Sequence, residues 1–178
     1  NCNEQKTIVQ YFSHPKHVYA LLIKKDTVIF KQLHKPLELD STIVSFNNSM
    51  GHLDSLTSIS AFQKFSKNAF QLYHTLFKPI EIHIPKNTQV VIISDSKFGG
   101  LPFEALIRRY PSNIERLDYK NLDYLVKDWQ FEYSFAVKTY LFNHQSKTKI
   151  KTSPKILAFA YSGDHQSLDQ LSTLRDDQ

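Results

Sequence analysis

Residues 90–106 read VVIISDSKFGGLPFEAL, and this stretch decides how the rest of the chain is interpreted. Its first four residues are apolar and predict a strand buried on both faces of a sheet. A polar loop follows, in which Gly99 and Gly100 allow backbone shapes closed to other residues. Residues 101–106 then predict a helix, because Pro102 suits a first helical position whose N–H needs no partner. Strand, loop and helix together predict an α/β fold with a functional loop at the carboxyl edge of its sheet.

Composition predicts one folded domain. The 178 residues suffice for a sizeable core, and 13 Phe and 9 Tyr compensate for a hydrophobic content of 41 %. No apolar run approaches the ~20 residues that a membrane helix needs, so we expect no membrane partner. The formal net charge is +5 and the pI about 9.2, but the lysines are scattered. We interpret the densest lysine group, residues 147–155, as a solvated loop, which makes a nucleic-acid partner unlikely.

The first residues give information on context. Residues 1–6 contain no initiator Met and no apolar signal segment, so we expect the chain to begin inside a longer protein. Cys2 is the only cysteine, which excludes an internal disulfide and fits a reducing, cytoplasmic compartment.

The N-terminal region, residues 1–57, predicts strands. Residues 18–23 (VYALLI) and 28–33 (VIFKQL) are β-rich, and the polar residues 24–27 between them predict a hairpin with a four-residue loop. Residues 7–12 (TIVQYF) predict a third strand in the same sheet.

A long amphipathic helix is predicted over residues 58–79. Apolar side chains recur there at steps of three and four, which is typical of one buried helix face. Ser58 or Ser60 can cap its start, and Pro79 is expected to end it.

The predicted α/β core, residues 90–161, continues after the helix at 101–106. Residues 124–126 and 130–133 predict two short strands, and Ser134 is expected to cap a short helix through Leu141. Residues 143–154 predict a polar connector, and the apolar run 156–161 (ILAFAY) predicts another buried strand. This alternation favours a mainly parallel sheet. Only a polar tail, residues 162–178, follows, so we expect the sheet to be incomplete at the C-terminus.

No residue pair in the sequence indicates catalysis. Cys2 lies in a polar leader, and His165, which follows Asp164, is interpreted as an exposed loop histidine. Asp95 ends the predicted strand at 90–93, where catalytic groups often lie, but no partner for it is identifiable. Gly99-Gly100 lacks a Walker A ending and is interpreted as a tight turn. The dispersed histidines indicate no metal site, and we expect no cofactor.

The order and spacing of these blocks resemble the CHAT domain, a caspase-like cysteine peptidase family usually joined to helical TPR repeats. The matching blocks are QYF and VYALLI, AFQLYHTLFKPI, VVIISDSKFGGLPFEAL, YLV and EY, and ILAFAY. The resemblance implies a caspase-like three-layer sandwich with a mainly parallel sheet, preceded by a β-hairpin and a long helix. It also implies a protein or peptide substrate and TPR repeats as partners in the parent chain.

The sequence also departs from that family. Ser94 and Ser96 flank Asp95 where Pro-Asp-Gly is usual, and Phe135-Ala136 replaces a usual Pro-Ser. The family's catalytic His and Cys lie beyond the strand that corresponds to residues 156–161, and neither motif exists here. No residue of this chain therefore inherits a catalytic role. The resemblance leaves Asp95, Gly99 and Gly100 as a possible wall of the substrate groove.

Two functions stay open at this point. The chain is either the N-terminal, non-catalytic portion of a CHAT-type peptidase or a catalytically inactive interaction or scaffold module on the same fold. A nucleic-acid-binding domain is a third interpretation, which rests only on net charge. An open edge of the parallel sheet would favour self-association.

Overall fold

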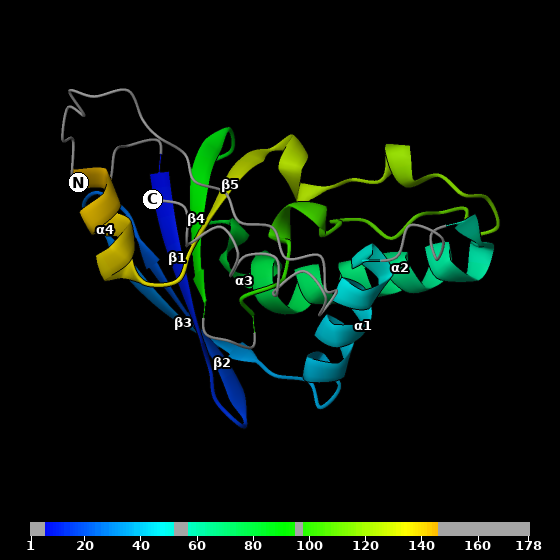
Figure 1. Ribbon diagram of the computed structural model, residues 1–178, viewed down its shortest axis with the longest axis horizontal. Coiled ribbons are helices and arrows are strands. Elements are labelled where there is room, and N and C mark those ends of the chain that lie inside the picture. Colours follow the sequence, from blue (N-terminus) through cyan, green and yellow to red (C-terminus); the bar gives the residue numbers. More distant parts are fainter. Residues whose placement is uncertain (1–5, 52–56, 95–97, 146–178) are drawn as a thin grey trace, which may run out of the picture. The chain divides into compact units, whose positions relative to one another are not determined.

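The structure, a computed structural model, describes residues 6–51, 57–94 and 98–145. All of them belong to one compact unit, Asn1–Gln145. Five strands form one sheet in the order β3-β2-β1-β4-β5 (Figure 1). Their bounds are β1 (Lys6–Ser13), β2 (His17–Ile23), β3 (Val28–His34), β4 (Thr88–Ser94) and β5 (Trp129–Ser134). The described α-helices are α1 (Leu39–Gly51), α2 (Ile59–Leu72), α3 (Lys78–Glu81) and α4 (Val137–Gln145).

The predicted N-terminal hairpin and its neighbouring strand are confirmed. β2 and β3 pair antiparallel, and the Lys24 N–H closes the turn by donating to the Thr27 carbonyl at 2.9 Å. β1 pairs antiparallel with β2 on one side and parallel with β4 on the other, so that Val9 faces both Leu22 and Ile92. β1 is therefore the strand at which the sheet changes direction.

The sheet is mixed rather than mainly parallel. β1 with β4 and β4 with β5 are parallel, whereas the two pairings of the hairpin region are antiparallel. Strands joined by a tight turn can pair only antiparallel, and the hairpin belongs to the same sheet as the parallel strands instead of preceding it. The predicted strand over 156–161 lies outside the described residues.

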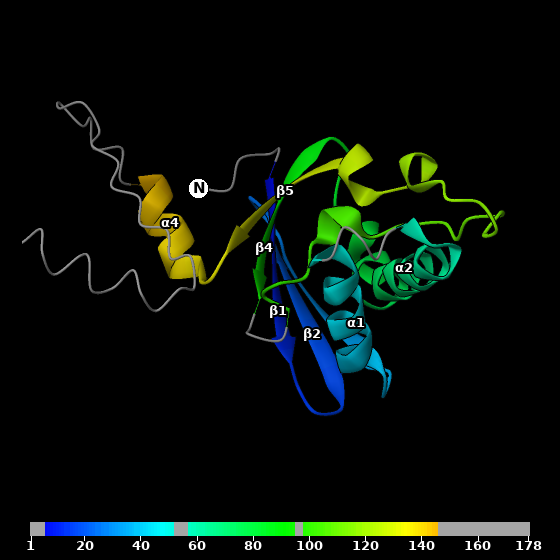
Figure 2. The same cartoon turned by 45° about the vertical axis from the view of Figure 1, so that its right-hand side comes forward.

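Helices cover both faces of the sheet (Figure 2). Alternate residues of each strand point to opposite faces, so each strand can contribute side chains to the helices on both sides. Val9 and Ile92 face the larger core, which is completed by α1, α2 and the segment after β4. Ile8, Val91 and Ile93 face the other side, where they pack against Tyr140 of α4. The alternation thus gives three layers with the sheet in the middle.

The long amphipathic helix is confirmed, but its end differs from the prediction. Ser58 is its N-cap, and its hydroxyl accepts a hydrogen bond from the Ala61 N–H at 3.1 Å. Pro79 does not end it, because a π-helical turn, η2 (Tyr73–Phe77), leads directly into α3. Pro79 lies in the first turn of α3, where a missing N–H does no harm.

The connection from β4 to β5 contains three 3₁₀ turns within its described residues: η3 (Phe103–Ala105), η4 (Tyr119–Asn121) and η5 (Leu125–Lys127). The predicted helix over residues 101–106 is wrong, because Pro102 and Leu106 both have extended backbones and leave only η3 between them. The predicted strand over 124–126 is also wrong. Tyr124 forms a single bridge to Ile107, and the chain then turns into η5.

The last described elements follow the sequence more closely. The strand predicted over residues 130–133 lies within β5, and the short helix predicted after it is α4. Ser134 does not cap α4, because it is the last residue of β5 and its hydroxyl donates to the Ala136 carbonyl at 3.2 Å. α4 also includes Asn143, which was predicted to begin a connector.

Candidate functional site

The predicted groove loop is described only in its second half. Gly99 and Gly100 are exposed and lie in a turn closed by the Leu101 N–H, which donates to the Phe98 carbonyl at 3.0 Å. Gly100 faces α1, where a Cβ added to it would lie 3.7 Å from Nδ2 of Asn47, an ordinary contact. Asp95 lies outside the described residues, as do Cys2 and His165.

An aromatic cluster lies beneath this turn and fixes it to the sheet. The ring of Tyr11 in β1 packs 5.9 Å from Phe98 and stacks 5.2 Å from Phe103, measured between ring centroids. The Tyr11 hydroxyl donates to the Leu76 carbonyl at 3.0 Å, and burial raises the pKa of Tyr11 well above its usual value. The cluster therefore joins the turn after β4 to both β1 and η2.

Tyr133 of β5 binds the LPFEAL stretch at its 3₁₀ turn, η3. Its phenol oxygen accepts a hydrogen bond from the Phe103 N–H at 2.7 Å and donates one to the Glu104 carboxylate. Burial and the neighbouring Glu104 raise the pKa of Tyr133. The Leu106 carbonyl accepts a hydrogen bond from the Leu125 N–H at 3.0 Å. Partners far along the chain thus bind the Phe103 N–H and the Leu106 carbonyl and hold this segment against β5 and η5.

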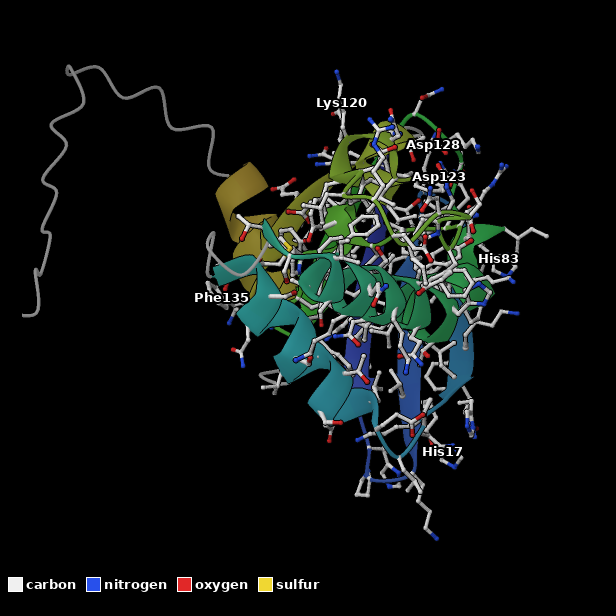
Figure 3. All side chains as sticks on the ribbon, turned by 90° about the vertical axis from the view of Figure 1, so that its right-hand side faces the viewer. His17, His83, Lys120, Asp123, Asp128 and Phe135 are labelled. Atoms are coloured by element: carbon white, nitrogen blue, oxygen red, sulfur yellow. The ribbon has the colours of Figure 1, made fainter. Side chains whose placement is uncertain are left out.

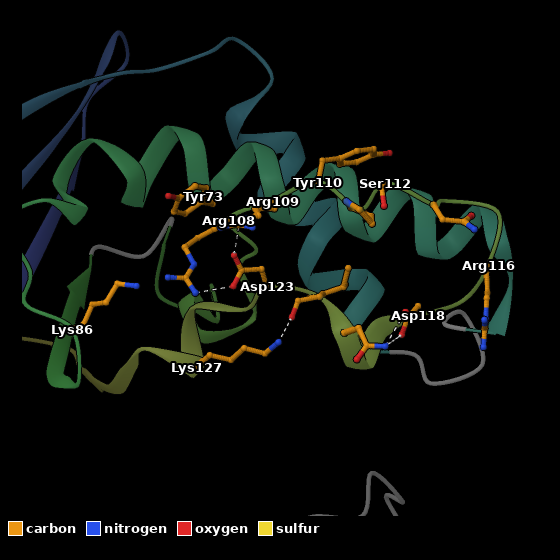
Figure 4. A pocket seen from close by; sticks show the side chains of 14 residues that line it. Tyr73, Lys86, Arg108, Arg109, Tyr110, Ser112, Arg116, Asp118, Asp123 and Lys127 are labelled. Atoms are coloured by element: carbon orange, nitrogen blue, oxygen red, sulfur yellow. Dashed lines mark hydrogen bonds and ion pairs between the residues drawn. The ribbon is translucent and has the colours of Figure 1, made fainter.

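A second site lies at the other end of the parallel strands. A cavity of about 830 Å³ opens near Lys86, just before β4, and near Asp123 in the approach to β5 (Figures 3 and 4). Its walls are the two arms of the connection between β4 and β5, together with η2. The lining residues are Tyr73, Lys86, Arg108, Arg109, Tyr110, Pro111, Ser112, Asn113, Arg116, Asp118, Asn121, Leu122, Asp123 and Lys127.

Arg108 lies at the centre of this cavity. Its Nη2 is 2.7 Å from Oδ1 of Asp123, its Nη1 pairs with Asp128, and its guanidinium lies 5.7 Å above the Trp129 ring. Its side chain is 16 % exposed, and its Nε atom is buried without a hydrogen-bond partner. Hydrogen bonds from Lys86 and Arg108 lower the pKa of Asp128.

The remaining polar groups of the cavity range from exposed, as in Arg109, to buried, as in Tyr73. The Arg109 side chain is 87 % exposed, and its Nε lies 3.6 Å from Oδ2 of Asp123. Lys127 donates to the Leu122 carbonyl at 2.7 Å, and Tyr73 donates to Glu81. The lining carries five cationic side chains and two carboxylates, and Asp128 beside it adds a third carboxylate that pairs with Lys86 and Arg108, so an excess of positive charge remains.

No family model matches the chain, and no curated protein matches it. Within the described part of the chain, no group of three or more His, Cys, Asp or Glu residues could hold a metal ion. None of the helices described there is both long and apolar enough to cross a membrane.

Sequence reasoning directed attention to one end of β4 and missed the cavity at the other. The sequence analysis assigned no function to residues 107–121. The signal available in that insert was its alternation of cations with acids, in IRRYPSNIERLDYKN and the following Asp123. Only the fold brings Arg108 beside both Asp123 and Asp128, which lie 15 and 20 residues further along the chain.

Proposed function

We propose that this chain is the N-terminal, non-catalytic portion of a caspase-like (CHAT) cysteine peptidase and supplies the scaffold for its catalytic part. The observation that carries the proposal is the parallel series β1-β4-β5, in which β5 is at the edge of the sheet among the described residues. A further parallel strand can add at that edge, and the apolar run 156–161 has the composition of such a strand.

The turn after β4 would form one wall of the substrate groove. Loops at the carboxyl ends of parallel strands are the usual place for ligands in α/β folds. Here Tyr11 of β1 stacks on the Phe103 ring, and Tyr133 of β5 accepts a hydrogen bond from the Phe103 N–H. Two strands of the sheet therefore fix the position of this segment. A rigid wall of this kind positions a peptide without taking part in the chemistry.

The chemistry itself would come from residues other than the described ones. In a cysteine peptidase a thiolate attacks the scissile carbonyl, and an imidazole exchanges the protons that the acyl-enzyme step requires. The sequence of this chain contains neither the family's His-Gly motif nor its Ser-Ala-Cys motif. We therefore expect the 178-residue chain alone not to cleave peptides.

The parent reading frame gives the first test. Codons after Gln178 that encode His-Gly and later Ala-Cys, each at the end of a predicted strand, would support the peptidase. The extended protein should then cleave a peptide library and react with a thiol-directed electrophile. Asp95→Ala is expected to lower its kcat/KM, whereas Lys67→Ala on the exposed face of α2 serves as the matched control. Unchanged kinetics for Asp95→Ala would remove the groove-wall role.

One observation favours an inactive interaction module as the second candidate. Phe135, at a position where the family usually has a Pro-Ser pair, is 94 % exposed directly after β5 (Figure 3). An exposed aromatic residue beside a sheet edge suits contact with another protein, including TPR repeats or a second copy of the chain. Absence of both motifs from the reading frame, with a dimer in solution that Phe135→Ser dissociates, would favour this module.

A further inference from the structure

The cavity around Arg108 gathers more positive charge than the ion pairs of Arg108 need. It collects five cationic side chains, Lys86, Arg108, Arg109, Arg116 and Lys127, and its lining has two acids, Asp118 and Asp123. A third acid, Asp128, pairs with Lys86 and Arg108, so the cations still outnumber the acids. Like charges gathered in one hollow repel one another and raise the local affinity for anions. Its volume of about 830 Å³ is within the range of small-molecule sites.

Arg108 is fixed in place before any ligand arrives. Asp123 and Asp128 each bind one terminal nitrogen, and the Trp129 ring supports the guanidinium plane. The pair of acids uses the two terminal nitrogens and leaves the buried Nε without an acceptor. A buried donor without a partner is costly, so an acceptor from a ligand at this position would be favourable.

Two of the other cations, Arg109 and Arg116, are free to follow a ligand, whereas Lys86 pairs with Asp128 at 3.0 Å and Lys127 donates to the Leu122 carbonyl at 2.7 Å. Arg109 makes only the long contact to Asp123, and no hydrogen bond or ion pair joins Arg116 to another described residue. In Figure 4, Lys86 and Arg116 lie at opposite ends of the cavity, with Arg108 and Lys127 between them. The positive charge is therefore distributed along the hollow instead of being focused at one point.

We propose that this cavity binds a compact anion that carries several phosphate groups. A single carboxylate or phosphate presents acceptors at one point, whereas a chain of phosphates presents acceptors along its length. Guanidinium groups match phosphate oxygens with paired, charge-assisted hydrogen bonds, and three of the five cations are arginines. Free polyphosphate and the phosphate chain of a nucleotide share this chemistry.

Calorimetric titration of the 178-residue protein with sodium tripolyphosphate and, separately, with ATP tests the proposal. We expect a dissociation constant below about 1 mM. The affinity should fall as salt is added, because salt screens the charges. ATP binding tighter than tripolyphosphate identifies a nucleotide as the source, and the reverse order identifies a free polyphosphate. Arg109→Ala and Arg116→Ala should each weaken binding by about fivefold or more, because each removes a charge-assisted contact.

Matched controls separate the cavity from general surface charge. Lys67→Ala removes an exposed cation on α2 outside the cavity and should leave the affinity unchanged. Circular dichroism checks that each variant is folded, which is expected because Arg109 is exposed and Arg116 lies on the surface. Three results would overturn the site: no binding by either probe, equal weakening by Lys67→Ala, or equally tight binding of hexaglutamate. None of these results depends on peptidase activity.

Discussion

The backbone N–H of Phe103 donates a hydrogen bond of 2.7 Å to the phenol oxygen of Tyr133, 30 residues further along the chain. Tyr133 belongs to β5, whereas Phe103 begins the 3₁₀ turn that follows β4. The same phenol donates its proton to Glu104, so one side chain satisfies two successive residues of the LPFEAL stretch. This contact fixes the turn after β4 relative to the neighbouring parallel strand.

Tyr133→Phe is expected to lower the free energy of unfolding by about 1–2 kcal/mol, because the Phe103 N–H and the Glu104 carboxylate both lose their partner. Urea unfolding measured by circular dichroism gives the value. Tyr110→Phe is the control, because the structure gives no hydrogen bond from that hydroxyl to a described residue and its ring is 41 % exposed. It should change stability by less than about 0.5 kcal/mol. Equal effects of the two substitutions would contradict the role of Tyr133.

Asp128→Asn should lower the free energy of unfolding at neutral pH by about 1–3 kcal/mol, because Arg108 loses one of its two ionised partners. The pKa of Asp128 is lowered in the folded protein by Lys86 and Arg108. A carboxyl with a lowered folded pKa stabilises the protein above its ordinary pKa and loses that contribution as the pH falls through the folded pKa.

The lowered pKa of Asp128 also predicts how the effect of this substitution depends on pH. The stability difference between the natural protein and Asp128→Asn should be largest near neutral pH and should shrink below the ordinary pKa of 3.8. Urea midpoints measured across the acid range show it. Asp118→Asn is the control within the same cavity, since Asp118 binds only the amide of Asn121 among the described residues. A constant difference at all pH values would mean that Asp128 acts through packing instead of charge.

Elements whose own sequence carries a strong pattern could be predicted. Side chains of β2 alternate between the two faces of the sheet, and α2 repeats Phe and Leu at helical spacing. Each pattern shows within its own segment which residues are buried, so the type of element could be predicted. α1 was missed because its sequence, LDSTIVSFNNSMG, is rich in poor helix formers. Only Leu39, Ile43 and Phe46 are buried in it, and Phe46 stacks 5.3 Å from Phe65 of α2. Packing on a distant helix therefore decides its structure.

The candidate sites were harder to predict for the same reason. A proline followed by an acid suggested that residues 101–106 begin a helix, but Tyr133 and Leu125 hold this segment through the Phe103 N–H and the Leu106 carbonyl, and only the 3₁₀ turn η3 forms. The cavity depends on the contact between Arg108 and Asp128, which lie 20 residues apart in the chain. No local sequence pattern predicts that contact. Tertiary partners override local preference at both places.

The N-cap of α2 offers a test that separates two neighbouring serines. Ser58→Ala should lower the free energy of unfolding by about 1 kcal/mol, because the Ala61 N–H loses its acceptor. Ser60→Ala should be neutral or slightly stabilising, because Ser60 lies within the helix and alanine is the better helix former. Thermal unfolding of both variants decides between them. A larger loss for Ser60→Ala would place the cap two residues later than the structure has it.

Gly100→Ala tests whether the turn after β4 requires glycine. The sequence suggests that it does, but Gly100 does not have a left-handed backbone, and an added methyl group would meet Asn47 at 3.7 Å. Stability should therefore stay unchanged or rise by up to about 1 kcal/mol, because alanine restricts the unfolded chain. Phe98→Ala in the same turn should cost about 3–5 kcal/mol, since its ring is fully buried and packs against Tyr11. Urea unfolding compares the two variants. A loss for Gly100→Ala close to that for Phe98→Ala would show that glycine, and not the buried aromatic ring, determines the shape of this turn.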